Sequence, residues 1–542
     1  MNEISQNASF RQVTESLLVQ ISLVSLIVLG LLWYATFRLG IPLTGEPFQS
    51  GLHGNDFKHI YLGPWMLSED QNPYDAEALM RAAKLRGLGA INPYVYPPFT
   101  ALVMTPLSKL SPPTALKTWF ILNHLFLISA CALIFLGLGL RPDLQNLCAM
   151  VLLAALSWPL HRTLTAGQLN LVLLLCFAAV FFFMRLRRPW IAGAIGAFAF
   201  LFKLIPGILL AYFFWSDFTL SRTNPQAVHS RRRLCIFSGS SWSINMYLCG
   251  LWAMVSMVLF SLLLLGLSVW GVGWDIHREF WPILQDMGYG KSTWADFGMH
   301  FYRDAANQSL NSLFHHLFVA WEGFRPWISL GPQWANNLTK ASWLVCVALL
   351  IWRTFPIRKG DPEMHLNQPI LYGLFVLLAL LTPSIYWDHY MILCLIPLMA
   401  CFGALPGRSR GLALALMVLI MFGVNGVIDR SYLWSRYGLG MLEQLSLIEI
   451  LLRVLFILVC LLVLLKALML LAGVLMSHGE KHSLLALWWA LSAAMVTMRF
   501  PYASPAFHHG PFMIFMSLGL IGTLSLFGLS LYLVSRPVPE RA

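Results

Sequence analysis

Residues 190–215 read WIAGAIGAFAFLFKLIPGILLAYFFW, an apolar stretch that contains one lysine and a Pro-Gly pair. Basic clusters flank it, RLRR at 185–188 and RRR at 231–233. Lys and Arg concentrate on the cytoplasmic side of membrane proteins, so a single crossing would leave one cluster outside. Because proline and glycine break helices, we expect two short helices hinged at 202–207. Both clusters then lie inside, and Lys203 lies at the outer tip of a hairpin.

The composition indicates an all-α polytopic membrane protein. The 542 residues are 58% hydrophobic and 11% charged, whereas soluble domains carry about 25% charged residues. Basic cytoplasmic loops account for the net charge of +12, so we expect membrane lipids rather than nucleic acid as partners. Nine scattered cysteines without a C-x-x-C pair favour buried thiols over disulfides or zinc. The N-terminal apolar run lacks a cleavage site and predicts a retained first helix.

Apolar stretches long enough to cross a bilayer recur along the whole chain. They lie at 16–36, 116–139, 144–161, 169–184, 248–270, 339–355, 369–383, 389–405, 411–427, 448–475, 483–500 and 511–534. With the hairpin they predict about 12 to 14 transmembrane helices. Both termini are expected in the cytoplasm, with large external loops at 37–115 and 271–338.

Polar residues recur at the predicted external ends of these helices. They are Asp56, Tyr96, Gln168, Asn170, Lys203, Asn307, Gln308, Asp388 and His389. Ionisable groups at membrane depth are costly and mark functional sites by default. Their agreement on one face predicts a site on the extracytoplasmic side.

The order of these motifs resembles glycosyltransferase family 87, the polyprenyl-phosphate-mannose-dependent α-mannosyltransferases of the GT-C superfamily. The motifs are Asp56 in the first loop, YPPF at 96–99, GQLN at 167–170, KLIP at 203–206, NQS at 307–309 and WDHY at 387–390. The resemblance covers roughly residues 15–405. Two features depart from it. TPSIYW at 382–387 is one residue longer than the usual family segment, and the last four helices match nothing in the family.

The resemblance implies a GT-C-like bundle with a catalytic module at 1–430 and additional helices at 431–542. It also implies a plasma-membrane enzyme without cofactor or metal. The donor would be a sugar, expected to be mannose, β-linked to a polyprenyl phosphate. Transfer to a hydroxyl of a glycolipid or glycan acceptor would invert the anomeric carbon.

Residue roles follow from that chemistry. An inverting displacement needs a base for the acceptor proton. A phosphate is already a weakly basic leaving group and needs no second carboxyl of the kind that glycosidases use. Asp56 is therefore the expected base, and His389 is expected to hydrogen-bond Asp56 or the acceptor. Lys203, Gln168 and Asn170 are assigned to the donor phosphate, and Tyr96, Asn307, Gln308 and Asp388 to substrate binding.

Each assignment has a simpler alternative. Asp56 fits a helix N-cap for 57–61, and Lys203 fits a lysine that extends to the membrane surface. Tyr96 fits an interfacial anchor, and Asn307 fits a helix cap. Asp75 with Glu77 resembles a metal-binding pair, but the position after Asn-Pro-Tyr favours a helix start.

At the level of function, a transporter or a lipid-linked oligosaccharide flippase or ligase is the alternative. The chain has no P-loop, G-x-S-x-G or H-E-x-x-H motif and no Asp-x-Asp pair.

Overall fold

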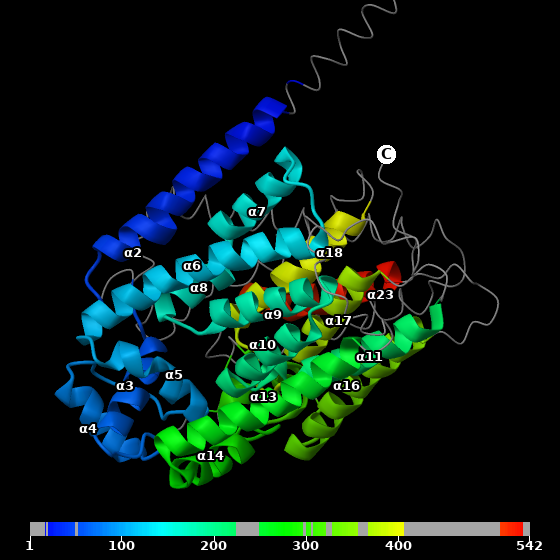
Figure 1. Cartoon of the computed structure of the whole chain (residues 1–542). Helices are drawn as coiled ribbons and strands as arrows, with labels where there is room; N and C mark the ends of the chain where they lie inside the picture. Colours follow the sequence, from blue (N-terminus) through cyan, green and yellow to red (C-terminus); the bar gives the residue numbers. More distant parts are fainter. Residues whose placement is uncertain are drawn as a thin grey trace, which may run out of the picture.

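The computed structural model describes residues 17, 20–48, 52–223, 249–295, 300–304, 307–320, 328–355, 367–405 and 510–534. Within these ranges every regular element is a helix, apart from one isolated bridge between Asn307 and Trp387. Figure 1 shows the helices running side by side, with most of them aligned along one direction. The chain is an all-α polytopic membrane protein, as predicted.

Four described helices are long and apolar enough to cross a membrane, and a bent pair adds a fifth candidate. The four are Gln20–Thr44, which ends in α2 (Ile41–Thr44), α6 (Pro112–Leu138), α13 (Cys249–Val272) and α16 (Pro332–Thr354). The bent pair is α7 (Leu144–Leu156) and α8 (Trp158–Ala166). Further apolar helices are α9 (Asn170–Arg185), α10 (Pro189–Phe202), α17 (Gln368–Leu381), α18 (Leu395–Ala404) and α23 (Gly510–Leu533). The spans expected at 411–427, 448–475 and 483–500 lie outside the described residues.

The hinge in 190–215 is confirmed. α10 ends at Phe202, a 3-10 turn covers Ile205–Gly207, and α11 (Ile208–Thr223) follows. The rings of Trp190 and Trp252 lie 5.4 Å apart, while the Asp217 carboxylate accepts the backbone N–H of Gly250 at 2.7 Å. The start of α10 and the end of α11 therefore meet the same end of α13, and Lys203 lies at the opposite end of the hairpin.

The first large loop is ordered and helical. It contains α3 (Phe57–Ser68), α4 (Ala76–Leu85) and α5 (Pro98–Ser108), and α3 packs against both others. Asp75 caps α4, since its side chain accepts the backbone N–H groups of Glu77 and Ala78 at 3.0 Å. The helix-start interpretation of this acidic pair is confirmed.

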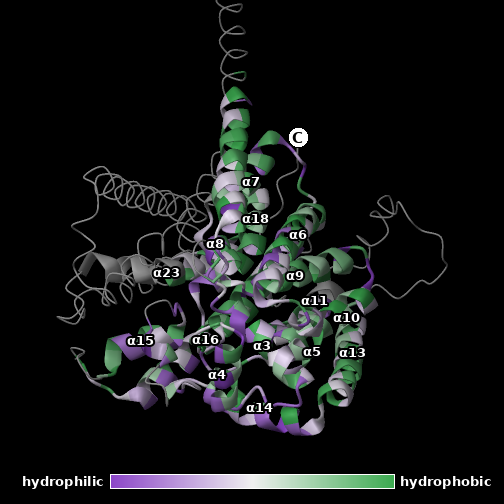
Figure 2. Cartoon of the chain, turned by 90° about the vertical axis from the view of Figure 1, so that its left-hand side faces the viewer, coloured by the Kyte–Doolittle hydropathy of each residue, from purple (hydrophilic) through white to green (hydrophobic). Residues whose placement is uncertain are grey.

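The second large loop contains α14 (Trp274–Asp286) and α15 (Leu310–Phe318). In Figure 1, α14 lies beside α3, α4 and α5 at one end of the bundle. Figure 2 looks onto that end and shows hydrophilic residues gathered over α4, α14 and α15. The two loops thus form a polar cap on one end of an apolar helix bundle.

Candidate active site

Asp56 is held by its backbone against the link between α8 and α9. Its N–H donates to the carbonyl of Ala166 at 3.1 Å, and the N–H of Gly54 donates to the carbonyl of Thr165 at 2.9 Å. Two bonds between segments so far apart in sequence fix their register. The first loop is thereby docked at the turn that carries Gln168 and Asn170.

Gly167 makes this close docking possible. Its φ of +74° lies in the left-handed region, which favours glycine. A Cβ at this position would lie 2.6 Å from the Cβ of Phe57. Its carbonyl also accepts the indole N–H of Trp119 at 2.9 Å. Any side chain at Gly167 would push the Asp56 segment away from α9.

The carboxylate of Asp56 does not cap α3. The helix begins at Phe57, as the N-cap alternative predicts, but the Asp56 side chain makes no capping hydrogen bond. The residue is half-buried and its charge acts on several neighbours. It favours the charged forms of Lys203 and His59, and it adds to burial in raising the pKa of Tyr96 well above the usual value. The helix start was thus predicted correctly, while the carboxylate remains available for other contacts.

Lys203 is buried at the tip of the hairpin. Its Nζ donates to Oδ1 of Asn170 at 3.1 Å and lies 3.9 Å from the centre of the Tyr390 ring, a cation–π contact. Burial lowers the pKa of Lys203 to about 7, and the charge of Asp56 acts in the opposite direction. Among the described residues no carboxylate lies within 4 Å of this ammonium. Its position therefore suits an additional anion, and the surface-extending alternative does not hold.

The WDHY segment packs against α8 and α9. The carbonyl of His389 accepts hydrogen bonds from Asn170 Nδ2 at 3.2 Å and from Thr163 Oγ1 at 3.3 Å. Asp388 Oδ1 lies 3.2 Å from Nδ1 of His389, and its other oxygen lies 3.8 Å from Nε of Arg162. The carboxylate beside the His389 ring is therefore Asp388. The expected hydrogen bond between His389 and Asp56 is not among the contacts of the described residues.

Tyr96 contacts the α8–α9 link through Gln168. Its hydroxyl donates to Oε1 of Gln168 at 3.4 Å, and its carbonyl accepts the hydroxyl of Tyr74 at 2.7 Å. Four residues later, Thr100 Oγ1 donates to the carbonyl of Phe202 at 2.7 Å, immediately before Lys203. Tyr96 is buried inside the protein rather than facing lipid. The YPPF segment thus connects the first loop both to Gln168 and to the hinge.

The side-chain amide of Asn307 is saturated by backbone groups. Its Nδ2 donates to the carbonyls of Phe301 and Ser384, both at 3.0 Å. Its Oδ1 accepts the N–H groups of Ser309 at 3.0 Å and Tyr386 at 2.9 Å. An amide offers two donors and two acceptor positions, and all four are in use. A substrate contact would have to replace one of these bonds.

Gln308 lies in the same connection. Its backbone N–H donates to the carbonyl of Tyr386 at 2.7 Å, and its side chain is buried. The cap of α15 is Ser309, whose hydroxyl accepts the N–H of Ser312 at 3.0 Å. The helix cap is therefore Ser309, the residue that follows Asn307 and Gln308. Together these bonds hold the segment before Asp388 and His389 in place.

With this geometry in hand, comparison with known proteins identifies the family. A family model described as glycosyltransferase family 87 matches residues 94–383, more than half of the chain. The chain belongs to glycosyltransferase family 87. It is a membrane glycosyltransferase, as the motifs predicted. The matched range includes Tyr96, Gln168 and Lys203, whereas Asp56 and His389 lie outside it.

Two relatives of this family 87 enzyme come from Mycobacterium tuberculosis. One is a polyprenol-phosphate-mannose-dependent α-(1-2)-phosphatidylinositol mannoside mannosyltransferase, 25% identical over 346 residues, or 61% of this chain and 67% of the relative. The other is the corresponding phosphatidylinositol pentamannoside mannosyltransferase, 25% identical over 343 residues, or 62% of this chain and 65% of the relative. The chain thus spans about two thirds of their length. No solved structure matches significantly.

Sequence reasoning missed two residues near Asp56 in this family 87 enzyme. Tyr390 belongs to the WDHY motif, but only the folded chain shows that its ring covers Lys203. His59 lies three residues after Asp56 on α3, a helical spacing that could have indicated their proximity. Burial lowers the pKa of His59 to about 4, so its ring is neutral at physiological pH.

Proposed function

We propose that this enzyme transfers mannose from a polyprenyl-phosphate carrier to a hydroxyl of a glycolipid at the extracytoplasmic face of the membrane. The names of both relatives support this donor and this acceptor class. The observation that carries the proposal is that Asp56 and Lys203 are both bound to the α8–α9 region, Asp56 through Ala166 and Lys203 through Asn170. A carboxylate that caps no helix acts on a buried ammonium that has no carboxylate within 4 Å among the described residues.

An inverting transfer needs a negative group that takes a proton and a positive group that stabilises the leaving phosphate, and Asp56 and Lys203 supply these two charges. The acceptor oxygen attacks the anomeric carbon while Asp56 takes the hydroxyl proton. The bond from the anomeric carbon to the phosphate oxygen breaks, and its electron pair leaves with the polyprenyl phosphate. Since phosphate is a weak base, no second acid has to protonate it. The ammonium of Lys203 stabilises the charge on the departing phosphate.

Asn170 and Gln168 have different roles at the phosphate site. Asn170 accepts from Lys203 through Oδ1 and donates to the His389 carbonyl through Nδ2, so its amide orientation is fixed. Gln168 accepts from Tyr96 through Oε1, which leaves its amide nitrogen to donate to a phosphate oxygen. We therefore assign Asn170 to positioning Lys203 and Gln168 to binding the phosphate.

His389 and Asp388 are assigned to the acceptor. Asp388 lies against Nδ1 of the ring. Neither of the buried ring nitrogens of His389, Nδ1 and Nε2, makes a hydrogen bond in the described structure. A buried nitrogen without a partner is costly and suits a ligand hydroxyl. In this arrangement the Asp388 carboxylate lies 3.2 Å from Nδ1 of the imidazole, and Nε2 binds the acceptor sugar.

The experiment is transfer of labelled mannose from polyprenyl-phosphate-mannose in membranes that contain Asp56→Asn. Loss of the base predicts a fall in kcat of about 10²- to 10⁴-fold at unchanged protein levels. Asp75→Asn is the matched control, because Asn also caps helices well and Asp75 lies on the same loop. If a normally inserted Asp56→Asn enzyme transfers mannose at the wild-type rate, Asp56 is not the catalytic base. A wild-type protein that moves lipid across vesicles without transferring sugar would favour the transporter alternative.

A further inference from the structure

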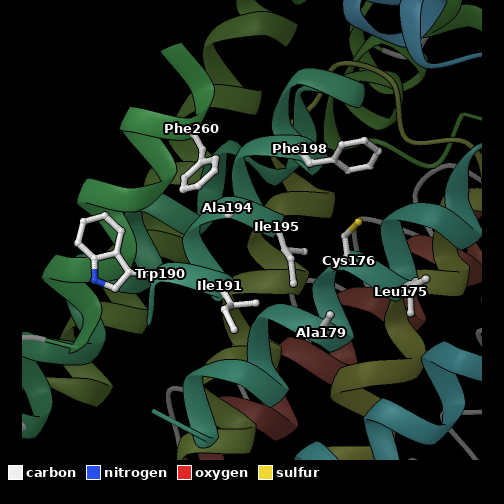
Figure 3. Close-up of a pocket in the computed structure, with 9 residues that line it drawn as sticks. All are labelled: Leu175, Cys176, Ala179, Trp190, Ile191, Ala194, Ile195, Phe198 and Phe260. Carbon is white, nitrogen blue, oxygen red and sulfur yellow. The ribbon is translucent and has the colours of Figure 1, made fainter. Parts of the chain in front are cut away.

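Exposed tryptophans stand at both ends of α13. Trp252 lies in its first turn, with the ring of Trp190 5.4 Å away, and Trp270 lies in its last turn. Figure 3 shows Trp190 beside α13, at the edge of an apolar groove formed by α9, α10 and α13. Trp270 follows Trp252 by 18 residues, about 27 Å of helix, close to the ~30 Å of a bilayer's hydrocarbon core. Tryptophan is enriched at the two membrane–water interfaces, so these rings mark both of them.

The antiparallel helix α16 repeats this spacing. Its exposed Trp334 and Trp352 are also 18 residues apart. The end of α16 and the start of α13 both bind the second half of α11 through hydrogen bonds. One interface therefore passes near Trp252 and Trp352, and the other passes near Trp270 and Trp334.

Helix α14 starts at the second of these interfaces. Gly273 separates it from α13 with a φ of +87°, a conformation that favours glycine. The ring of His277 then fixes α14 to the last turn of α13. Its Nδ1 donates to the carbonyl of Gly273 at 2.9 Å, and its Nε2 accepts the hydroxyl of Ser268 at 3.0 Å. The first turn of α14 is thereby held at the level of Trp270.

Helix α14 has three distinct faces. At about 100° per residue, Trp274 and Trp281 lie within about 20° of each other, and their side chains are 65% and 60% exposed. Phe280 lies about 120° away and is partly covered, with its ring 5.8 Å from that of Tyr74 in the first loop. The third face carries exposed acids, namely Asp275, Glu279 and Asp286. One face thus packs on the protein, and an aromatic face and an acidic face are left uncovered.

We propose that α14 lies along the membrane surface, with Trp274 and Trp281 inserted into the lipid headgroup region and the acidic face in water. A helix with separate aromatic and charged faces and little overall hydrophobicity adopts this position at a bilayer. The level of the interface, marked by Trp270 on α13 and Trp334 on α16, is the level at which α14 begins. The partner of the aromatic face is therefore the headgroup layer of the adjoining leaflet.

Polar residues of the same face limit the depth of insertion. Arg278 and Gln285 lie within about 40° of Trp274 around the helix. The guanidinium of Arg278 lies 3.3 Å from the carboxylate of Asp275. Charged and amide groups lose their hydration in hydrocarbon, so α14 rests among the headgroups and does not enter the core.

This position connects the bilayer surface to the candidate site. The hydroxyl of Tyr289, just after α14, donates to the carbonyl of Thr382. The hydroxyl of Ser384 donates to the carbonyl of Met287. Both bonds reach the segment before WDHY, and the inner face of α14 packs on Tyr74 of the first loop. A helix fixed at the membrane surface therefore holds both loops of the site at a defined depth.

The test introduces the photoreactive amino acid benzoylphenylalanine at position 274, 281 or 279, one at a time. All three side chains are exposed, so the replacements leave the packed face of α14 intact. The full-length protein is placed in vesicles of phosphatidylethanolamine and phosphatidylglycerol, irradiated and analysed by mass spectrometry. Phospholipid adducts should be about tenfold more abundant at 274 and 281 than at 279, because the acidic face points to water. Similar yields at all three positions, or no adducts at 274 and 281, would overturn the proposal.

Hydrogen exchange in the same vesicles provides a measurement without crosslinking. Trp274→Ser with Trp281→Ser removes the aromatic face, and Glu279→Ser with Asp286→Ser is the control with as many serines in the same helix. Loss of lipid contact should speed exchange of the α14 amides about tenfold relative to the control, because local opening depends on the contacts that hold a segment. Equal exchange in both variants would mean that lipid does not hold α14, and the proposal would be wrong. Neither measurement requires mannose transfer, so both are independent of the proposed function.

Discussion

Two aspartates of the first loop stand immediately before helices and do different things. Asp75 is exposed, and its carboxylate is used by the N–H groups at the start of α4. Asp56 precedes α3 but makes no side-chain cap, and its backbone is bound to the α8–α9 link instead. Residue type and local context are alike in the two cases. The difference lies in the groups that interact with each carboxylate, namely the N–H groups of α4 for Asp75 and the charge of Lys203 for Asp56.

The largest effect beyond loss of the base should come from removing Lys203, the cation on which the charge of Asp56 acts. Lys203→Ala is expected to raise the donor KM by about 100-fold or more, since the bound phosphate loses a buried charged partner. The acceptor KM should change far less. Steady-state transfer with each substrate varied in turn measures both.

Lys84→Ala provides the comparison for Lys203→Ala. Lys84 lies exposed in the last turn of α4, on the helix that Asp75 caps. It should leave both KM values unchanged, because exposed charges contribute little to a distant site. Equal losses in donor and acceptor KM for Lys203→Ala would remove Lys203 from the phosphate site.

The pH dependence of donor binding tests the role of the Lys203 charge, and so the difference between Asp56 and Asp75. Burial lowers the pKa of Lys203 to about 7, so raising the pH above that value removes the ammonium that binds phosphate. Donor affinity should therefore fall as pH rises, approaching about tenfold per pH unit well above the pKa. Binding of a photoreactive or fluorescent polyprenyl phosphate measures this without requiring turnover.

The two aspartates should shift this pH profile differently. The Asp56 carboxylate favours protonated Lys203, so Asp56→Asn should lower the pKa of Lys203 and move the loss of binding to lower pH. Asp75→Asn should leave the midpoint where it is. A Lys203→Arg enzyme that still binds donor should show a flat profile in this range, because a guanidinium stays charged. An identical slope for Lys203→Arg and wild type would assign the titration to another group.

The smallest effect is expected from removing the Asp75 cap of α4. Asp75→Ala removes the acceptor for two N–H groups of α4 and is expected to cost about 1 kcal/mol of stability. Thermal unfolding of the purified protein in detergent should show a lower Tm, with mannose transfer at permissive temperature unchanged. Asp75→Asn should restore the Tm. Loss of transfer at normal stability would mean that Asp75 belongs to the site after all.

Features that depend on neighbouring residues in sequence were predictable. The hinge at 202–207 follows from one proline, one glycine and two basic clusters, and the structure confirms it. The cap of α4 follows from Asp75 preceding a helical stretch. The helices of the bundle were also predictable from the long apolar runs, because a membrane span requires only sufficient length and hydrophobicity.

Features that depend on tertiary packing were not predictable. The sequence carries no sign that the Tyr390 ring lies under Lys203. Asn307 looked like a substrate contact because it is polar and lies near an external helix end. Two of its four hydrogen bonds to backbone groups form only when Asn307 meets Ser384 and Tyr386.

The docking of Asp56 on the α8–α9 link also has a consequence for biosynthesis. The first loop is synthesised well before α9 and the hairpin, and chains emerge from the N-terminus onward. Until α8 has been inserted, no carbonyls of Thr165 and Ala166 are present to receive the first loop. Lys203 arrives later still. If Asp56 and Lys203 act together as proposed, the site is complete only when insertion has passed the hairpin, and we expect a nascent or truncated chain to transfer no sugar.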